Sequence, residues 1–186
     1  MTNIIGLLGY KQVGKSTAAE YLKTKGYQRH NMKDGLVAEL KDNFPDLLRE
    51  IDKEACRNIG GISANINYLF EFKPPLIRTL MQNYGTEVRR GDDPDYWVHQ
   101  WVNNRPEGLI VTDDVRFLNE AQAIKDCGGT LIRITRDDIT DGGSHASETE
   151  TNSIQVDHTI VAKQGDLEGM YKRIDDILSP DNPLEQ

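Results

Sequence analysis

Features common in exported and membrane proteins are scarce in this sequence. Only two cysteines occur among 186 residues, Cys56 and Cys127, and their spacing matches no metal-binding pattern. Such sparse cysteine use favours a reducing cytoplasm. No segment approaches the ~20 consecutive apolar residues that cross a bilayer, so we expect no membrane contact. The first apolar stretch already begins at residue 4, which leaves no room for a signal peptide.

Basic residues are also in deficit. The sequence has 22 Lys and Arg against 30 Asp and Glu, which gives a net charge of −8. This balance argues against a broad nucleic-acid-binding face, and we expect no nucleic-acid partner. A small anionic ligand remains compatible with it, because a few arginines can be concentrated locally. The length suits one domain with insertions rather than two independent domains.

One motif stands out near the N-terminus. The segment Gly9-Tyr10-Lys11-Gln12-Val13-Gly14-Lys15-Ser16 fits the phosphate-binding pattern G-x-x-x-x-G-K-[ST] without a mismatch. The apolar run 4–8 before it suits a buried strand, and the segment 17–23 after it suits the start of a helix. Strand, glycine loop and helix form the context that a phosphate-binding loop requires.

The chemistry expected of this loop is the binding of ATP and Mg²⁺. Glycines let backbone N–H groups approach phosphate oxygens, and the following helix adds its positive N-terminal end. Lys15 would contact the β- and γ-phosphates, and the Ser16 hydroxyl would ligate Mg²⁺. The candidate ATP-binding residues of the loop are Gly9, Lys11, Gln12, Val13, Gly14, Lys15, Ser16 and Thr17.

Strand and helix patterns alternate along the rest of the chain. This alternation predicts an α/β fold, a three-layer sandwich in which helices flank both faces of a parallel sheet. Ligands of such sheets bind beyond the carboxyl ends of the strands. Strands are expected at 4–8, 27–32, 109–111, 130–135 and 159–162, and helices at 17–23, 34–43, 47–59, 75–84 (extending to 90), after Asp93-Pro94, from Asn119, and from Asp166.

Asp113 and Asp114 directly follow an expected buried strand. In phosphate-loop enzymes an acidic residue at this place holds Mg²⁺, directly or through water. Strand alternation sends the two side chains to opposite sides, and we favour Asp114 for the side that faces the site. The alternative is an exposed acidic turn.

Arg78, Gln82 and Arg89 form a polar stripe on an expected helix. At ~100° per residue they fall within about 40° of each other. The stripe is either a solvated face or an anion-binding wall, in which arginines would grip a phosphate. A break at Gly85 would weaken this argument. The opposing core face would consist of Leu76, Ile77, Leu80, Met81, Tyr84 and Val88.

Other polar and aromatic residues have two interpretations each. Asp34 follows the expected second strand, where it would orient an acceptor or cap a helix. Asp93 caps the helix that carries Trp97 and Trp101, whose rings would either stack on a base or belong to the core. The polar stretch after Arg136 is long for a compact domain, which favours a lid that excludes water.

These motifs together resemble the deoxynucleoside monophosphate kinases of bacteriophages, within the nucleoside monophosphate kinase group. The phosphate loop is shared with many NTPases, whereas the middle blocks are more discriminating. The matching blocks are Gly9–Thr17, Arg78–Arg90, Asp92–Trp97, Asp114–Glu120 and His145–Glu150.

The resemblance implies Mg²⁺-dependent transfer of the ATP γ-phosphoryl group to a deoxynucleoside monophosphate (dNMP). It implies one domain over 1–186, with an NMP-binding insertion at about 33–105 and a lid at about 136–152, in the host cytoplasm if the source is a phage. Exposed apolar surface on the insertion could support a homodimer. Residues 137–152 contain no arginine, unlike the usual lid of adenylate kinases.

Residue roles follow from the same resemblance. Lys15, Arg78, Arg116, Arg136 and Asp114 are the catalytic candidates, with Arg136 on the ATP side and Ser16 and Asp114 at the metal. The dNMP-binding candidates are Asp34, Arg78, Gln82, Arg89, Asp93, Trp97 and Arg116.

Two alternatives stay open. A kinase of another small phosphorylated acceptor, such as dephospho-coenzyme A or phosphomevalonate, would share this architecture. A regulatory GTPase is less compatible, because the guanine-selecting N-K-x-D motif needs an Asn-Lys pair and none occurs.

Overall fold

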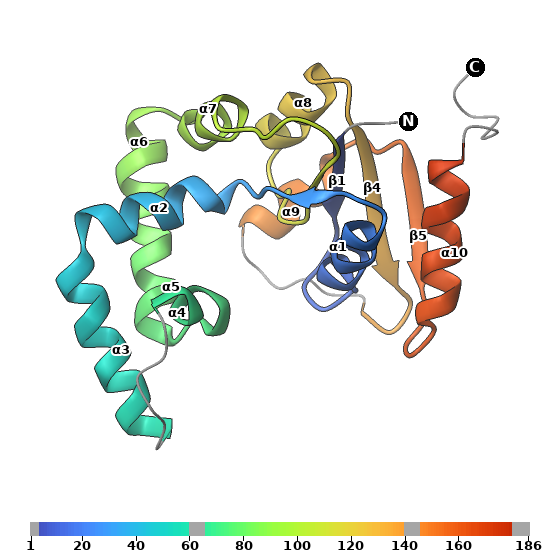
Figure 1. Ribbon diagram of the computed structural model, residues 1–186. Coiled ribbons are helices and arrows are strands. Elements are labelled where there is room, and N and C mark those ends of the chain that lie inside the picture. The colour runs from blue at the N-terminus through green and yellow to red at the C-terminus, as the bar shows by residue number, and fades with distance from the viewer. Residues whose placement is uncertain (1–3, 60–65, 140–145, 180–186) are drawn as a thin grey trace. The chain divides into compact units, whose positions relative to one another are not determined.

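The computed structural model describes residues 4–59, 66–139 and 146–179 (Figure 1). The chain divides into two compact units. Met1–Met32 and Trp101–Gln186 form the first, which we call the sheet unit, and Lys33–Gln100 form the second, the helical unit. No helix among the described ranges combines the length and apolar character that a membrane span needs.

The sheet unit contains a five-stranded parallel sheet in the order β2-β3-β1-β4-β5. This confirms the predicted α/β class with a parallel sheet. The second strand is shorter than the expected 27–32: the His30 N–H still donates to the Val111 carbonyl oxygen at 3.0 Å, but the Met32 N–H donates to the Asp114 side chain instead of to β3. The strands are β1 (Ile4–Leu8), β2 (Gln28–Arg29), β3 (Ile110–Thr112), β4 (Thr130–Arg136) and β5 (His158–Ala162).

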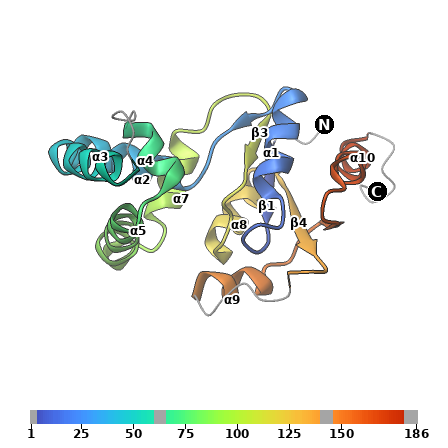
Figure 2. The same cartoon turned by 90° about the horizontal axis from the view of Figure 1, so that it is seen from below.

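Helices cover both faces of this sheet (Figure 2). Helices α1 (Lys15–Thr24) and α10 (Leu167–Leu178) pack on the face that carries Ile5 and Leu7. Helix α8 (Leu118–Asp126) packs on the face that carries Ile4 and Leu8. The alternation of β1 side chains therefore serves both layers, as a parallel strand buried on two sides requires. Helix α9 spans Ala146–Ser153.

Two of the predicted helix boundaries have contrasting outcomes. The Asp166 carboxylate accepts a hydrogen bond from the Gly169 N–H at 2.9 Å, so it caps α10 as expected. The expected cap at Asn119 is wrong, because α8 already begins at Leu118. The Glu120 carboxylate accepts the N–H groups of Arg116 and Phe117 just before the helix, and the Asn119 side chain accepts the Glu120 N–H at 2.9 Å.

The helical unit has its own apolar core, which includes Leu40, Leu48, Ile77 and the ring of Trp97. Helix α4 was not expected, since it lies between the helices expected at 47–59 and 75–84. The helices are α2 (Lys33–Asn43), α3 (Pro45–Ile59), α4 (Ile66–Phe72), α5 (Pro75–Gln82), α6 (Arg90–Asp92) and α7 (Tyr96–Asn103), the last of which extends into the sheet unit.

A π-helix, η1 (Asn83–Arg89), continues α5. Its i→i+5 turns are wider than those of an α-helix, so each residue advances by a smaller angle. The helix therefore continues through Gly85 without a break. Beyond Gln82, however, the side chains lie at other angles around the helix axis than a regular α-helix would give. Val88, assigned to the core face, is 48% exposed. Leu76, in α5, was also assigned to the core face but is 54% exposed.

Candidate active site at the carboxyl edge of the sheet

The carboxyl ends of four strands bring the polar residues of the sheet unit into a row. The strand order places Arg29 at the end of β2, then Asp113 after β3, then Gly9 after β1, then Arg136 at the end of β4. This is the edge at which parallel α/β sheets bind ligands.

The glycine loop has the backbone geometry that its sequence predicts. Gly9 adopts φ +136°, and a Cβ there would lie 2.1 Å from the carbonyl oxygen of Ile134. Gly14 (φ +111°) directly precedes α1, and Gln12 also has a positive φ of 67°. Only glycine fits at Gly9, because both the conformation and the close approach exclude a side chain.

Lys15 lies back over this loop. Its Nζ donates to the carbonyl oxygens of Gly9 at 2.6 Å and Tyr10 at 2.7 Å. The ammonium group is thus held within the loop by weak neutral acceptors, which an anionic phosphate can replace. Of the remaining loop candidates, Val13 is buried in the core beneath the loop, whereas Lys11 and Gln12 are exposed.

Arg136 reaches the same loop from β4. Its guanidinium donates to the Gln12 carbonyl oxygen at 3.2 Å and to both oxygens of Asp138, at 2.9 and 2.5 Å. The hydrogen bond from Arg136 lowers the pKa of Asp138, and the same bond raises the pKa of Arg136. The geometry thus places the Arg136 guanidinium beside the loop, and its role on the ATP side stays a prediction.

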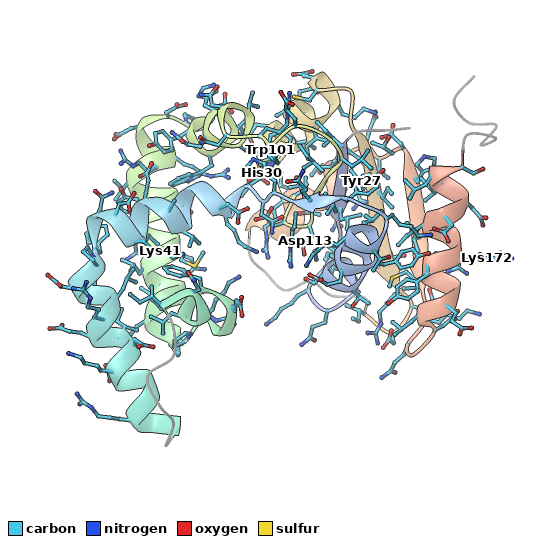
Figure 3. The ribbon with its side chains drawn as sticks, in the orientation of Figure 1. Tyr27, His30, Lys41, Trp101, Asp113 and Lys172 are labelled. Carbon is cyan, nitrogen blue, oxygen red and sulfur yellow. The ribbon has the colours of Figure 1, made fainter. Side chains whose placement is uncertain are left out.

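Asp113, labelled in Figure 3, directly follows β3 at the carboxyl edge of the sheet. Its Oδ2 accepts the Ser16 hydroxyl at 3.0 Å, and Arg29 pairs with both carboxylate oxygens, Nε to Oδ1 at 3.0 Å and Nη2 to Oδ2 at 2.5 Å. The side chain of Asp113 is only 3% exposed and that of Arg29 is 32% exposed. Asp113 was the less favoured of two candidates in the sequence, and Arg29 was not singled out.

The choice of Asp114 over Asp113 is therefore corrected by the geometry. The Asp114 carboxylate accepts the Met32 N–H at 3.0 Å, and it is Asp113 that contacts Ser16. The cause is that β3 ends at Thr112, so both aspartates belong to the following loop, where strand alternation no longer applies. The Asn31 side chain fixes that loop by accepting the Asp113 N–H at 3.0 Å.

The backbone around Arg116 is held by side chains from two helices. Glu120 is only 2% exposed, and its carboxylate accepts the N–H groups of Arg116 at 2.8 Å and Phe117 at 3.2 Å. From α9, the Thr151 hydroxyl donates to the Arg116 carbonyl oxygen at 3.0 Å. The Arg116 side chain itself is exposed, so it is presented from a fixed backbone.

The expected lid is only partly described. Residues 140–145 and the side chains of 146–149, which include every side chain of the His145–Glu150 block except that of Glu150, lie outside the described residues. Within the described part, the Asn152 amide donates to the Tyr10 hydroxyl at 2.7 Å. Arg133 of β4 donates to the Ile154 carbonyl oxygen at 2.6 Å. Burial of its guanidinium lowers the pKa of Arg133.

In the helical unit, Arg89 does not lie in the polar stripe that was expected for it together with Arg78 and Gln82. It donates to the Glu39 carboxylate and to the Tyr84 hydroxyl, and its guanidinium lies over the rings of Tyr84 and Tyr96. Burial would raise the pKa of Glu39, but hydrogen bonds from Tyr96, Tyr84 and Arg89 outweigh it and lower that pKa. The wider turns of η1 account for the changed position of Arg89 relative to Arg78 and Gln82.

Arg78 and Gln82 are exposed on α5, and the Arg78 Nε donates to the Lys73 carbonyl oxygen at 2.9 Å. Asp34 is exposed within the first turn of α2, which begins one residue earlier, so it is not the helix cap.

Asp93 and Trp97 both have structural partners within the helical unit. The Asp93 carboxylate accepts the Asp95 N–H at 3.0 Å and lies 3.3 Å from His99, just before α7. Trp97 is 3% exposed, and its indole N–H donates to the Gly85 carbonyl oxygen at 2.9 Å. Trp101 is 2% exposed. Both tryptophans are core residues, and stacking of their rings on a base is not supported.

The fold and this edge define a class: a parallel α/β protein with a phosphate-binding-type loop between its first strand and first helix. Comparison with known proteins is more specific. A family model described as deoxynucleotide monophosphate kinase matches residues 46–174. The chain therefore belongs to the deoxynucleotide monophosphate kinase family, a family of phosphotransferases. The resemblance to nucleotide kinases expected from the sequence is confirmed.

Two individual proteins are similar to the chain. A protein of Acanthamoeba polyphaga mimivirus, whose name describes it provisionally as a deoxynucleotide monophosphate kinase, is 30% identical over 202 residues, which cover 92% of this chain and 93% of that protein. The crystal structure of TT1252 from Thermus thermophilus matches with a TM-score of 0.48 and 17% identity, over 95% of this chain and 96% of that one.

Proposed function

We propose that the protein transfers the γ-phosphoryl group of ATP to a deoxynucleoside monophosphate, giving ADP and the deoxynucleoside diphosphate in the presence of Mg²⁺. The observation that carries this proposal is the row at the carboxyl edge of the sheet. There Lys15 lies within the glycine loop, and Ser16 contacts a buried aspartate. Kinase chemistry on a phosphate needs this combination of a phosphate cradle and a carboxylate beside it.

On the donor side, Lys15 would exchange its two carbonyl acceptors for the β- and γ-phosphates. Arg136, at 3.2 Å from the Gln12 carbonyl oxygen, would neutralise charge on the same polyphosphate. In both cases the cation exchanges a neutral carbonyl oxygen or a solvent-exposed carboxylate for a phosphate with stronger anionic character. The exchange favours phosphate binding. The segment 136–152 would act as the lid.

The residues next to the loop fit Mg²⁺. The Ser16 hydroxyl and the Asp113 carboxylate are hard oxygen donors, and they lie 3.0 Å apart. In the described ranges no group of three or more His, Cys, Asp or Glu could hold a metal alone. In phosphoryl-transfer sites Mg²⁺ is usually held by one or two side chains together with substrate phosphates and water. Mg²⁺ would supply charge neutralisation between the phosphates.

On the acceptor side, we assign binding of the dNMP phosphate to Arg78, Gln82, Arg89 and Arg116. The acceptor is already an anionic phosphate, so transfer needs no strong general base. Positioning and charge neutralisation would supply most of the rate enhancement. The fixed backbone of Arg116 supports its assignment, because the side chain extends from a position held by Glu120 and Thr151.

The experiment that tests this function is an acceptor panel. ADP release from ATP and Mg²⁺ is measured with each deoxynucleoside and ribonucleoside monophosphate, and with dephospho-coenzyme A and phosphomevalonate. Lys15→Ala is the negative control and should reduce turnover by a factor on the order of a thousand while the melting temperature is retained. Lys23→Ala, an exposed lysine of α1 paired with Glu20, is the matched surface control.

We expect turnover with at least one dNMP that exceeds turnover with every non-nucleotide acceptor. Turnover restricted to dephospho-coenzyme A or phosphomevalonate would contradict the proposed acceptor. Normal turnover by Lys15→Ala would contradict the role of the loop.

A further inference from the structure

The pair between Arg29 and Asp113 is not explained by phosphate binding alone. Arg29 occupies both carboxylate oxygens of Asp113, at 3.0 and 2.5 Å, and one of these oxygens is the one that Ser16 contacts. The carboxylate assigned to the metal is thus already neutralised by a guanidinium. A planar guanidinium matches a carboxylate in this two-pronged way better than any other side chain does.

The burial of the two partners is unequal. The Asp113 side chain is 3% exposed, so its charge needs a partner at all times. The Arg29 side chain is 32% exposed, and its Nη1 lies 3.5 Å from the Glu20 carboxylate, which is 56% exposed. Arg29 can therefore move away from Asp113 and keep a carboxylate partner on α1.

We propose that Arg29 is the counter-ion that occupies the metal carboxylate in the nucleotide-free protein and gives it up when Mg²⁺ binds with the nucleotide. This inference rests on the proposed function. Arg29 keeps the buried Asp113 paired while the loop is empty, and it competes with Mg²⁺ for the same oxygens. A protein with this arrangement holds Mg²⁺ weakly by itself and strongly only when phosphates share the coordination.

The competition predicts the sign of a binding change. In Arg29→Gln the competitor is absent, so Mg²⁺ should bind more tightly to the complex with ADP. We expect the Mg²⁺ dissociation constant, measured by calorimetric titration at saturating ADP, to fall by about fivefold or more, within the range of coupled sites. Without ligands this variant should melt at a lower temperature, because the buried Asp113 loses its two bonds from Arg29, and Mg²⁺ with ADP should raise its melting temperature more than that of the wild type.

Three further variants make the test specific. Arg173→Gln removes the same charge from α10, where Arg173 donates to the Val161 carbonyl oxygen, and should leave the Mg²⁺ affinity unchanged. Arg29→Lys keeps the charge but loses the two-pronged pair, so the affinity should increase less than in Arg29→Gln. It also serves if Arg29→Gln does not fold. In an Asp113→Asn background, Arg29→Gln should have no further effect on Mg²⁺ binding.

The outcomes separate the two proposals. Unchanged or weaker Mg²⁺ binding by folded Arg29→Gln, with normal binding by the wild type, would overturn the role of Arg29 alone. An equal ligand-induced rise in melting temperature in both proteins would do the same, because it would make Arg29 merely structural. A wild type that shows no Mg²⁺-dependent ADP binding would overturn the proposed function, and this inference with it.

Discussion

The Arg89 guanidinium lies 2.8 Å from the Glu39 carboxylate, within a cluster that also contains the hydroxyl groups of Tyr84 and Tyr96. The two tyrosine rings lie 5.3 and 4.9 Å from the guanidinium, so Arg89 is held by a carboxylate as well as by stacking. An arginine fixed in this way is pre-organised to bind an anion with its remaining N–H groups.

Glu39→Gln should therefore weaken acceptor binding. The amide keeps the shape but loses the charge-assisted bonds to Arg89, which are worth about 1.5 kcal/mol. Because we assign Arg89 to the acceptor phosphate, the KM for the dNMP should rise roughly tenfold, which is the factor that corresponds to this energy. The KM for ATP should stay within about twofold. Steady-state kinetics with each substrate varied in turn measures both constants.

The matched control is Asp42→Asn, an exposed carboxylate on the same helix. It should change neither KM. An unaltered acceptor KM in Glu39→Gln would show that the cluster serves only the packing of the helical unit.

The sequence predicted the fold class and the glycine loop better than it predicted which side chains pair at the carboxyl edge of the sheet. The parallel α/β class and the glycine loop depend on local patterns, namely apolar runs and a fixed spacing, which sequence reveals directly. The pairing of Arg29 with Asp113 depends on β2 lying beside β3, and these residues are 84 positions apart. Strand order of this kind is set by the packing of the whole sheet, so no local pattern indicates it.

Two other errors have a common origin in extrapolated periodicity. The choice of Asp114 extended strand alternation beyond Thr112, where the strand has already ended. The position of Arg89 extended the 100° step of an α-helix through a π-helical segment. In both cases the periodicity held to the end of the regular element, at Thr112 for the strand and at Gln82 for the α-helix. The functional residue lay beyond that end, where the periodicity no longer applied.

Gly9→Ala should destabilise the sheet unit. An added Cβ would lie 2.1 Å from the Ile134 carbonyl oxygen, and the backbone at φ +136° disfavours any side chain. The strained conformation alone costs about 1–3 kcal/mol, and relief of the clash requires β4 to move as well. We expect a loss of unfolding free energy of about 3 kcal/mol or more, measured by urea denaturation.

Gly128→Ala provides the control that separates these two effects. Gly128 has φ +74°, but nothing lies within 4 Å of an added Cβ. Its substitution should therefore cost only about 1–2 kcal/mol, from the left-handed conformation. Equal losses in the two variants would contradict a close approach between the glycine loop and β4.

Asp157 should make the stability of the sheet unit depend on acidity. Burial would raise the pKa of its carboxyl group, but the bonds from the Leu131 N–H at 2.7 Å and the Lys125 ammonium at 2.6 Å outweigh burial and lower that pKa. A depressed pKa in the folded state stabilises the protein above the unfolded value, near 3.9 for Asp, and this stabilisation is lost as the pH falls through the folded value.

Asp157→Asn removes the charge and keeps an acceptor oxygen for Leu131. At pH 7 the variant should be less stable than the wild type by about 1 kcal/mol, the order of the difference between charged and neutral hydrogen bonds. Below about pH 4 the two unfolding free energies should converge, because the wild-type carboxylate is then becoming protonated. Urea denaturation at a series of pH values measures this convergence. A difference that stays constant down to the acid-unfolding limit would show that the charge of Asp157 does not stabilise the junction of β4 and β5.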